Sequence, residues 1–172
     1  MISVENLSKI YTVGIFKKRR FKAVDNVSLT INAGETLGLV GESGCGKSTL
    51  ARTILRLISP SGGKVYFKGR DVFAATPREL YEIRGKMQII FQHPETAFNP
   101  RLKIYDSLAE PLRLRKLTRN RAGERERIMD MLEQVGLHAE HLTRYPHELS
   151  GGQIQRLVLA RILSLRPEFI VA

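Results

Sequence analysis

The feature that most constrains the fold is a glycine-rich stretch in the first third of the chain, LGLVGESGCGKSTL at residues 37–50. It opens with an apolar run of the kind that a buried strand uses, made of Leu37, Leu39 and Val40. The run breaks into a glycine-rich turn, after which Lys47 begins a segment with a helical pattern. The spacing G-x-x-x-x-G-K-[ST] from Gly41 to Ser48 is typical of a phosphate-binding loop.

The chemistry of phosphate binding explains this spacing. Glycines let the backbone curl so that successive N–H groups point at phosphate oxygens, and the following helix adds its dipole. We expect Lys47 to reach the β- and γ-phosphates and the Ser48 hydroxyl to bind Mg²⁺. The predicted phosphate-binding loop and the start of its helix comprise Gly41, Glu42, Ser43, Gly44, Cys45, Gly46, Lys47, Ser48 and Thr49. A glycine turn without a ligand is the alternative, and the strand–turn–helix context disfavours it.

Composition places the chain among globular proteins. Its 172 residues suffice for one domain with a core, with or without a small subdomain. No apolar run approaches the ~20 residues that span a bilayer, and the first residues lack the pattern of a signal peptide. We therefore expect a location in the cytoplasm, at the face of the cell membrane if the chain docks on a membrane protein. A single cysteine, Cys45, excludes an internal disulfide and fits a reducing compartment.

The formal net charge of +11 is concentrated in two clusters. The first holds Lys17, Lys18, Arg19, Arg20 and Lys22, and the second holds Arg113, Arg115, Lys116, Arg119, Arg121, Arg125 and Arg127. Such clusters can bind nucleic acid or anionic lipid, but solvated loops and helix faces are the more frequent origin. Because Glu124 and Glu126 interrupt the second cluster, and no aromatic residues alternate with its cations, we do not expect a nucleic-acid partner.

The remaining patterns predict an order of strands and helices. Before residue 92 we expect strands over 2–13 and 23–31 joined by a basic loop at 14–22, a helix from the phosphate loop to near Ser59-Pro60, a strand or hairpin over 64–72, a short helix over 77–84 and a strand over 87–91. Later we expect helices over 103–136 interrupted at Pro111 and around Asn120, with Gly136 as a C-cap. Ser150 is a predicted N-cap, and residues 169–172 suit a buried strand.

With these pieces in order, the chain resembles the ATP-binding subunits of ABC transporters. LSGGQ at 149–153 is similar to the signature motif of that family, Gln92 matches its Q-loop glutamine, and Tyr11 matches its A-loop aromatic residue. The stretch FQHPETAFNPRLKIYDSLAEPL at 91–112 and the basic insertion after Tyr11 are similar to the oligopeptide and dipeptide importer branch. That branch also contains nickel and oligosaccharide importers, so the sequence leaves the solute open.

The resemblance implies an α/β fold: a phosphate-loop NTPase core with a peripheral antiparallel β part and an inserted helical subdomain. Residues 1–92 would form the core, 93–148 the helical subdomain, and 149–172 the signature motif, its helix and the start of the next core strand. Tyr11 would stack on adenine, Ser48 and Gln92 would hold Mg²⁺, and Lys47 and Gln92 would take part in ATP hydrolysis. Ser150, Gly151, Gly152 and Gln153 would contact the γ-phosphate held by a second ATP-binding subunit, identical or related.

The resemblance also implies partners. The helical insert would receive a coupling helix from an integral membrane permease, which in turn receives solute from an extracytoplasmic binding protein. In family members, an aspartate and a glutamate needed for hydrolysis follow the strand that matches 169–172. We therefore interpret the chain as a fragment cut one residue before these carboxylates, and expect it to bind ATP without efficient hydrolysis.

Two other functions remain open from the sequence. One is a DNA-associated ATPase of the SMC type, although only about a hundred residues separate Ser48 from Ser150, without the sustained heptads of a long coiled coil. The other is a non-catalytic regulatory subunit. The four histidines do not form a zinc-like pattern and are predicted to lie at the surface: His93, His138, His141 and His147. Cys45 is interpreted as a small residue tolerated where only the backbone matters.

Overall fold

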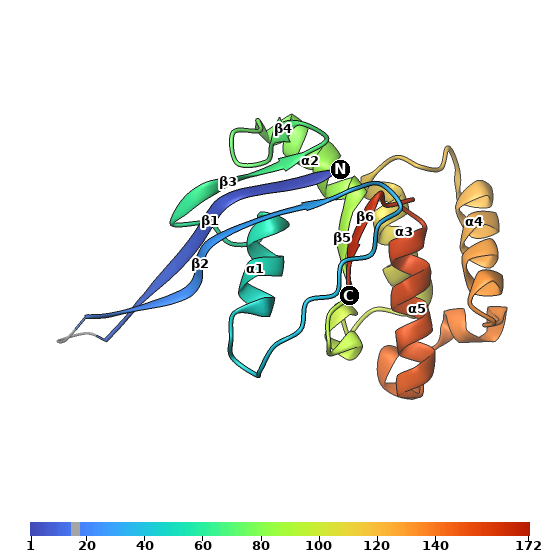
Figure 1. Ribbon diagram of the computed structural model, residues 1–172. Coiled ribbons are helices and arrows are strands. Elements are labelled where there is room, and N and C mark those ends of the chain that lie inside the picture. The colour runs from blue at the N-terminus through green and yellow to red at the C-terminus, as the bar shows by residue number, and fades with distance from the viewer. Residues whose placement is uncertain (15–17) are drawn as a thin grey trace. The chain divides into compact units, whose positions relative to one another are not determined.

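The computed structural model describes residues 1–14 and 18–172, which form two compact units, Met1–Arg84 and Gly85–Ala172. The strands and α-helices of both units are labelled in Figure 1, and each unit is described here by itself. The division falls within helix α2 (Pro77–Lys86). The division at residues 92 and 148 predicted from the sequence follows functional segments instead, and stays a prediction.

The first unit is built on an antiparallel sheet with the strand order β2-β1-β3-β4. Its strands are β1 (Ile2–Val13), β2 (Arg19–Ile31), β3 (Gly62–Phe67) and β4 (Arg70–Asp71). The two predicted long strands and the predicted hairpin over 64–72 are thereby confirmed. The basic loop is shorter than predicted, because Arg19 and Arg20 pair with Val13 and Thr12 as part of β2. Lys17, also assigned to that loop, lies outside the described residues.

A β-bulge keeps the apolar side chains of β1 on one face of the sheet. Val4 pairs with Leu29 and Leu7 with Val27, so β1 carries one residue more than β2 between these pairs. Asn6, within this bulge, has a φ of +49°. The extra residue reverses the alternation, and Val4 and Leu7 are therefore both buried. Helix α1 (Lys47–Ile54) contacts β1 and β2 and buries Leu50, Thr53 and Ile54.

The predicted buried strand before the phosphate loop is wrong for this structure. Residues 37–40 are outside any strand, and the exposed fractions are 46% for Leu37, 49% for Leu39 and 95% for Val40. Among the strand pairings within residues 1–14 and 18–172, none includes this segment. A strand needs a neighbour that accepts and donates its backbone hydrogen bonds, so the apolar pattern alone does not produce one.

Helix α1 is also shorter than predicted, ending at Ile54 instead of near Ser59-Pro60. Arg56 follows with a φ of +51°, which a helix does not tolerate. Its guanidinium donates to the carbonyl oxygens of Val72 at 2.6 Å and Ala75 at 3.1 Å. These contacts with distant backbone stabilise the turn that ends the helix.

The second unit joins a two-stranded parallel sheet to a group of helices. Its elements are β5 (Met87–Ile89), η1 (Pro94–Ala97), α3 (Ile104–Leu114), α4 (Arg121–Gln134), η2 (Ala139–Thr143), η3 (Pro146–Glu148), α5 (Gly151–Leu163) and β6 (Phe169–Val171). Strand β5 pairs with β6 in parallel register, Met87 opposite Phe169. The predicted strand over 169–172 is confirmed, but it is not buried: Ile170 is 40% exposed. The pairing gives β6 only one neighbour, β5, among the described strands.

Helices α3, α4 and α5 enclose one apolar core, in which Leu108, Leu112, Leu132 and Leu157 are fully buried. The predicted interruption at Pro111 is wrong, because α3 continues through it to Leu114. Pro111 removes one helical hydrogen bond, and the burial of Leu108 and Leu112 on either side offsets this loss.

The predicted interruption around Asn120 and the predicted C-cap at Gly136 are both confirmed at the ends of α4. The Asn120 side chain accepts a hydrogen bond from the N–H of Gly123 at 2.9 Å, which starts the helix. At the other end Gly136 has a φ of +67° and donates to Glu133, while Leu137 donates to Leu132. This pair of bonds is a Schellman motif, and it places Leu137 in the core beside the helix that it ends.

A buried carboxylate links α3 to α4. Glu124 is 5% exposed and accepts from Arg113 Nε and Nη2, both at 2.7 Å, and from Tyr105 Oη at 2.9 Å. The hydrogen bonds from Arg113 hold the pKa of Glu124 below its usual value of 4.5. Burial, followed by the bond to Glu124, raises the pKa of Tyr105. One member of the second basic cluster, the half-exposed Arg113, therefore also pairs with a buried carboxylate.

Candidate nucleotide-binding site

The glycine-rich loop of the first unit ends at the N-terminus of α1. Gly46 occupies the N-cap position with a φ of +101°, and no side chain caps the helix. Its carbonyl accepts the N–H of Leu50 at 2.9 Å, which starts the helical hydrogen bonding. The first N–H groups of a helix have no acceptor within it. An uncapped helix start that follows exposed glycines is therefore suited to binding an anion.

Lys47 holds the loop in a curled form. Its Nζ donates to the carbonyl oxygens of Gly41 and Glu42, both at 2.6 Å, and lies 3.5 Å from Cys45 Sγ. The N–H of Cys45 donates to the carbonyl of Glu42 at 3.3 Å. These bonds place a positive charge inside a loop whose residues 41–45 are exposed. Of the predicted residues, Gly41 to Gly46 form this loop, and Lys47, Ser48 and Thr49 form the first turn of α1.

The other predicted nucleotide residue of this unit, Tyr11, lies near the end of β1 and is 38% exposed. It pairs across the hairpin with Phe21, which is 55% exposed, and Lys9 Nζ lies 5.1 Å from the centre of its ring. Phe21 was not predicted to be a site residue, because residues 14–22 were expected to form a loop and not part of a strand. The hairpin therefore presents two adjacent aromatic rings instead of one.

Backbone contact connects this hairpin to the phosphate loop. Lys9 pairs with Val24 and Ile10 with Lys22, so Ala23 is the extra residue of a β-bulge. A Cβ built on Gly46 would lie 1.9 Å from the carbonyl oxygen of Ala23. Only a residue without a side chain fits at this contact, which fixes β2 against the start of α1.

Gln92, the predicted Q-loop residue, belongs to the second unit. It is exposed and lies three residues beyond β5 and two residues before η1. The segment after it is held by Arg161 of α5, which donates to the Ala97 carbonyl and to Glu110, both at 2.7 Å. Gln92 and the phosphate loop lie in different units, so the predicted sharing of Mg²⁺ between Ser48 and Gln92 stays a prediction.

The second glycine-rich helix start lies at α5, and here the predicted N-cap is confirmed. Ser150 Oγ accepts from the N–H of Gln153 at 3.3 Å, and Gln153 Oε1 accepts from the N–H of Ser150 at 2.9 Å. This reciprocal pair is a capping box. Gly151 and Gly152, in the first turn, are both exposed.

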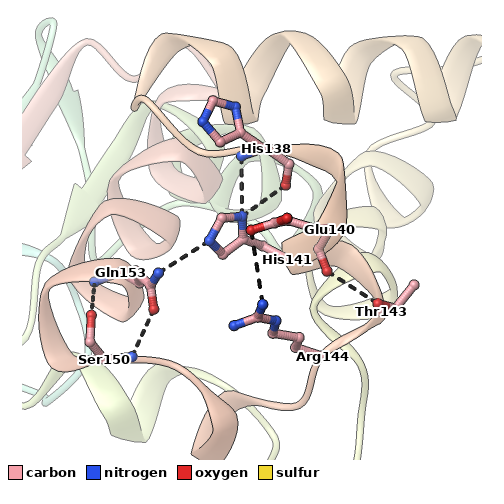
Figure 2. A network of polar contacts seen from close by, with 7 residues as sticks. All are labelled: His138, Glu140, His141, Thr143, Arg144, Ser150 and Gln153. Atoms are coloured by element: carbon pink, nitrogen blue, oxygen red, sulfur yellow. Dashed lines mark hydrogen bonds and ion pairs between the residues drawn. The ribbon is translucent and has the colours of Figure 1, made fainter.

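A histidine supports this capping box, as Figure 2 shows. His141 Nε2 lies 3.1 Å from Gln153 Nε2, and its Nδ1 lies 3.0 Å from the carbonyl oxygen of His138. The predicted surface position of His141 is wrong, since the residue is only 5% exposed. The turn of η2 directs its ring inward, whereas His93, His138 and His147 are exposed as predicted.

Comparison with known proteins identifies the family. A model of the ABC transporter family matches residues 24–172. The chain belongs to the ABC transporter family. Within the part of the chain that the structure describes, no helix is both long enough and apolar enough to cross a bilayer.

Relatives of this ABC protein include ATP-binding proteins of peptide transport. The chain is 44% identical to the oligopeptide transport ATP-binding protein OppF of Streptococcus mutans over 172 residues, which are all of this chain and 55% of that protein. It is 51% identical to OppF of Bacillus subtilis over 152 residues, 88% of this chain and 50% of the relative. The dipeptide transport protein DppF of Lactococcus lactis is 45% identical over 174 residues, 100% of this chain and 55% of the relative. The chain thus spans about half the length of these curated relatives.

Solved ABC cassettes share the fold. The dimeric cassette MJ0796, solved in a post-hydrolysis state with ADP and Pi, is 31% identical with a TM-score of 0.85, over 99% of this chain and 72% of that one. The protein CbiO1 of Clostridium perfringens, part of the ABC transporter complex CbiONQ, has a TM-score of 0.77 at 23% identity, over 98% of this chain and 63% of that one, and so supports the fold alone. The predicted α/β fold of an ABC-type ATPase is confirmed.

Proposed function

We propose that this chain is the nucleotide-binding part of an ATP-binding subunit that drives the uptake of peptides across the cell membrane. One observation carries the proposal: two glycine-rich helix starts occur in one chain, one uncapped around Lys47 and one capped by Ser150. Similarity to peptide-transport proteins along the whole chain supports the choice of importer over a DNA-associated ATPase. Nickel and oligosaccharides are the alternative solutes within the same branch.

In this proposal the first unit binds ATP. Tyr11 stacks on adenine, and base–aromatic stacking contributes about 1–3 kcal/mol. The N–H groups from Gly41 to Thr49 receive the phosphates, and Lys47 exchanges its two carbonyl partners for phosphate oxygens. That exchange is favourable because a hydrogen bond between two charged groups is stronger than one to a neutral carbonyl.

The residues present also fit a bound Mg²⁺. This ion takes few protein ligands, and it usually keeps several waters besides substrate phosphates. The Ser48 hydroxyl is exposed in the first turn of α1, and the Gln92 amide is exposed after β5, so both oxygens are accessible to solvent. Bound there, the ion would neutralise the phosphate charge that develops during hydrolysis. Lys47 would stabilise the same charge, while Gln92 would orient water.

The second helix start serves a different nucleotide. Ser150, Gly151, Gly152 and Gln153 contact the γ-phosphate bound by a second ATP-binding subunit, identical or related. An isolated chain has one phosphate loop for two anion-binding helix starts, so head-to-tail pairing gives each start a phosphate. ATP binding then closes the pair, and the helical segment 93–148 transmits this closure to membrane permease subunits. These permeases would receive solute from an extracytoplasmic binding protein and place the ATP-binding subunit at the cytoplasmic membrane face.

The proposal is tested by solute uptake in cells that carry the full-length gene on a plasmid in place of the deleted chromosomal copy. Labelled tripeptide, nickel and maltotriose are supplied separately, and we expect only tripeptide uptake to fall with the Lys47→Ala variant. Loss of nickel or maltotriose uptake instead would change the proposed solute. Normal uptake of all three, together with salt-dependent binding of the purified protein to duplex DNA, would overturn the importer function.

A further inference from the structure

The ring of His141 lies in the interior of the second unit, whereas His93, His138 and His147 are exposed. None of these histidines is a proposed nucleotide contact. His141 belongs to η2, twelve residues before Gln153, and only 5% of the residue is exposed. Its two ring nitrogens contact two different elements, the backbone of His138 and the side chain of Gln153 (Figure 2). The ring therefore bridges a turn and the capping box of α5.

The hydrogen bonds of Gln153 assign the proton of this ring. The N–H of Ser150 can only donate, so the amide atom that faces it at 2.9 Å must be the oxygen of Gln153. The amide nitrogen, which is a donor, then faces His141 Nε2 at 3.1 Å. That ring nitrogen must accept, and the proton lies on Nδ1, from which it donates to the His138 carbonyl at 3.0 Å.

The opposite tautomer fits less well. It would let Nδ1 accept from the N–H of His138, which lies 3.2 Å away. However, it would point Nε2–H at the amide N–H₂ group of Gln153, placing two donors against each other. Relief of this conflict by an amide flip would turn the N–H₂ group toward the N–H of Ser150. One neutral tautomer of His141 therefore satisfies both ends of the bridge.

We propose that His141 is a positioning residue for the signature motif at residues 149–153. Its Nε2 fixes the amide orientation of Gln153, and the Gln153 amide in turn fixes the backbone of Ser150. The inference rests on the proposed function in one respect, that Ser150 and the two following glycines contact a phosphate. His141 itself touches no nucleotide. Its effect is to hold the N–H groups of α5 in place before the phosphate arrives, which lowers the entropy lost on binding.

The turn that carries His141 is itself supported from two sides. Glu140 and Arg144 form an ion pair at 3.9 Å, and Thr143 Oγ1 donates to the Glu140 carbonyl at 3.1 Å (Figure 2). The carbonyl of Arg144 accepts from the N–H of Ile104, the first residue of α3. The ring thus projects from backbone tied to the helical core, so it can restrain Gln153 instead of following it.

Two variants separate the two halves of the bridge. The amide of asparagine ends near the position of Nδ1, so His141→Asn keeps the contact with His138 and loses the one with Gln153. Glutamine is one carbon longer, so His141→Gln keeps an acceptor for Gln153 and loses the contact within the turn. A purely structural histidine would make the effects of both variants follow the loss of stability, whichever contact is kept.

The test uses the full-length protein and begins without nucleotide. Amide hydrogen exchange at Ser150 is measured by NMR, with unfolding midpoints as the stability control. We expect exchange to be roughly fivefold faster in His141→Asn than in wild type, the size of one lost neutral hydrogen bond, and within twofold of wild type in His141→Gln. In the wild-type protein, ¹⁵N shifts of His141 are expected to show the proton on Nδ1. Equal exchange in the two variants, or a proton on Nε2, overturns the positioning role.

The second readout is ATP turnover by the full-length protein assembled with its partner subunit. We expect His141→Asn to lower kcat roughly fivefold with KM for ATP unchanged, since the phosphate loop that sets affinity is in another unit, and His141→Gln to restore kcat. Faster exchange with unchanged kcat would overturn the link to catalysis. If Ser150→Ala also leaves kcat unchanged, the proposed phosphate contact of the signature motif fails as well, and the two failures are thereby distinguished.

Discussion

The two glycine-rich helix starts of this chain solve the same local problem in opposite ways. At α1 the N-cap is a glycine with a φ of +101°, no side chain caps the helix, and a lysine from the first turn closes the loop. At α5 the serine and glutamine of a capping box bond to each other, and a buried histidine supports the glutamine. The first start depends on a charged side chain bonded to loop carbonyls, whereas the second is held by neutral groups that are paired with one another.

This difference indicates how each helix start acts on a phosphate. Lys47 must leave the carbonyl oxygens of Gly41 and Glu42 when an anion enters, so the first start reorganises on binding. Ser150 and Gln153 do not need to exchange hydrogen-bond partners in this way. The N–H groups that follow Ser150 are therefore oriented before a phosphate binds. Reorganisation suits the site that selects and retains ATP, while a preformed start suits a surface that recognises ATP already bound elsewhere.

The largest expected effect comes from removing the charge that closes the first loop. We expect Lys47→Ala to weaken ATP binding by the full-length protein about 10- to 100-fold, since hydrogen bonds to charged groups contribute about 1.5–3 kcal/mol. Isothermal titration calorimetry at fixed salt measures the change. Lys64→Ala is the control, because it removes an equal charge from an exposed position on β3 of the same unit. If both variants weaken binding equally, the loss reflects net charge and not the loop.

The next largest effect concerns the backbone of the first helix start. Gly46→Ala should lower the free energy of unfolding by about 2–3 kcal/mol, through a strained φ and the contact with the Ala23 carbonyl. Gly44→Ala is the matched variant, with a φ of +84° but nothing within 4 Å of its Cβ, and should cost about 1 kcal/mol. Urea unfolding of the full-length protein compares them. Equal losses would mean that β2 does not restrain the loop.

Replacement of Glu124 tests whether the start of α5 depends on the core enclosed by α3, α4 and α5. Glu124→Gln should lower the stability of the second unit by about 2 kcal/mol and speed hydrogen exchange at Ser150, without changing exchange at Leu50 in the first unit. Because the pKa of Glu124 is lowered in the folded state, its contribution is present above the ordinary pKa of 4.5 and is lost as the pH falls through the lowered value. The wild-type protein should therefore lose stability below about pH 4.5 more steeply than Glu124→Gln, as acid titrations of hydrogen exchange would reveal. Parallel acid profiles would contradict this prediction.

The smallest expected effect on stability is at the serine cap. Ser150→Ala should cost about 1 kcal/mol, whereas Ser150→Asn, a good N-cap, should cost only a few tenths. We expect both variants to reduce ATP-dependent closure of the assembled subunit pair, since both lack the hydroxyl proposed to reach phosphate. Thermal unfolding and light scattering with Mg-ATP measure the two properties. Normal closure by Ser150→Asn would assign the serine to helix capping alone.

Features were predicted correctly where the interactions that form them join residues close together in the sequence. The caps at Gly136 and Ser150 depend on residues within three to five positions, and both were predicted correctly. The phosphate loop and the signature motif were recognised by spacing, for the same reason. Each of these features results from interactions between residues that are near one another in the chain.

Features that depend on distant residues were predicted poorly. The apolar run at residues 37–40 was predicted as a strand, but a strand also needs a neighbour, and local pattern cannot supply one. The early end of α1 depends on carbonyl groups of Val72 and Ala75, sixteen and nineteen positions beyond Arg56. His141 was assigned to the surface because nothing in its local pattern indicates a partner at Gln153.

The contact of Ala23 with Gly46 has a consequence for how such chains can change in length. Between the strand residues beside Tyr11 and the start of α1, the spacing is set by main-chain atoms, not by interchangeable side chains. Substitutions at residue 23 should therefore be tolerated, while a one-residue insertion or deletion there would slide the aromatic pair along the hairpin by about 3.3 Å. That distance is close to the thickness of an aromatic ring. Length variation in the hairpin is therefore expected toward its tip, beyond Tyr11 and Phe21, and not at the bulge.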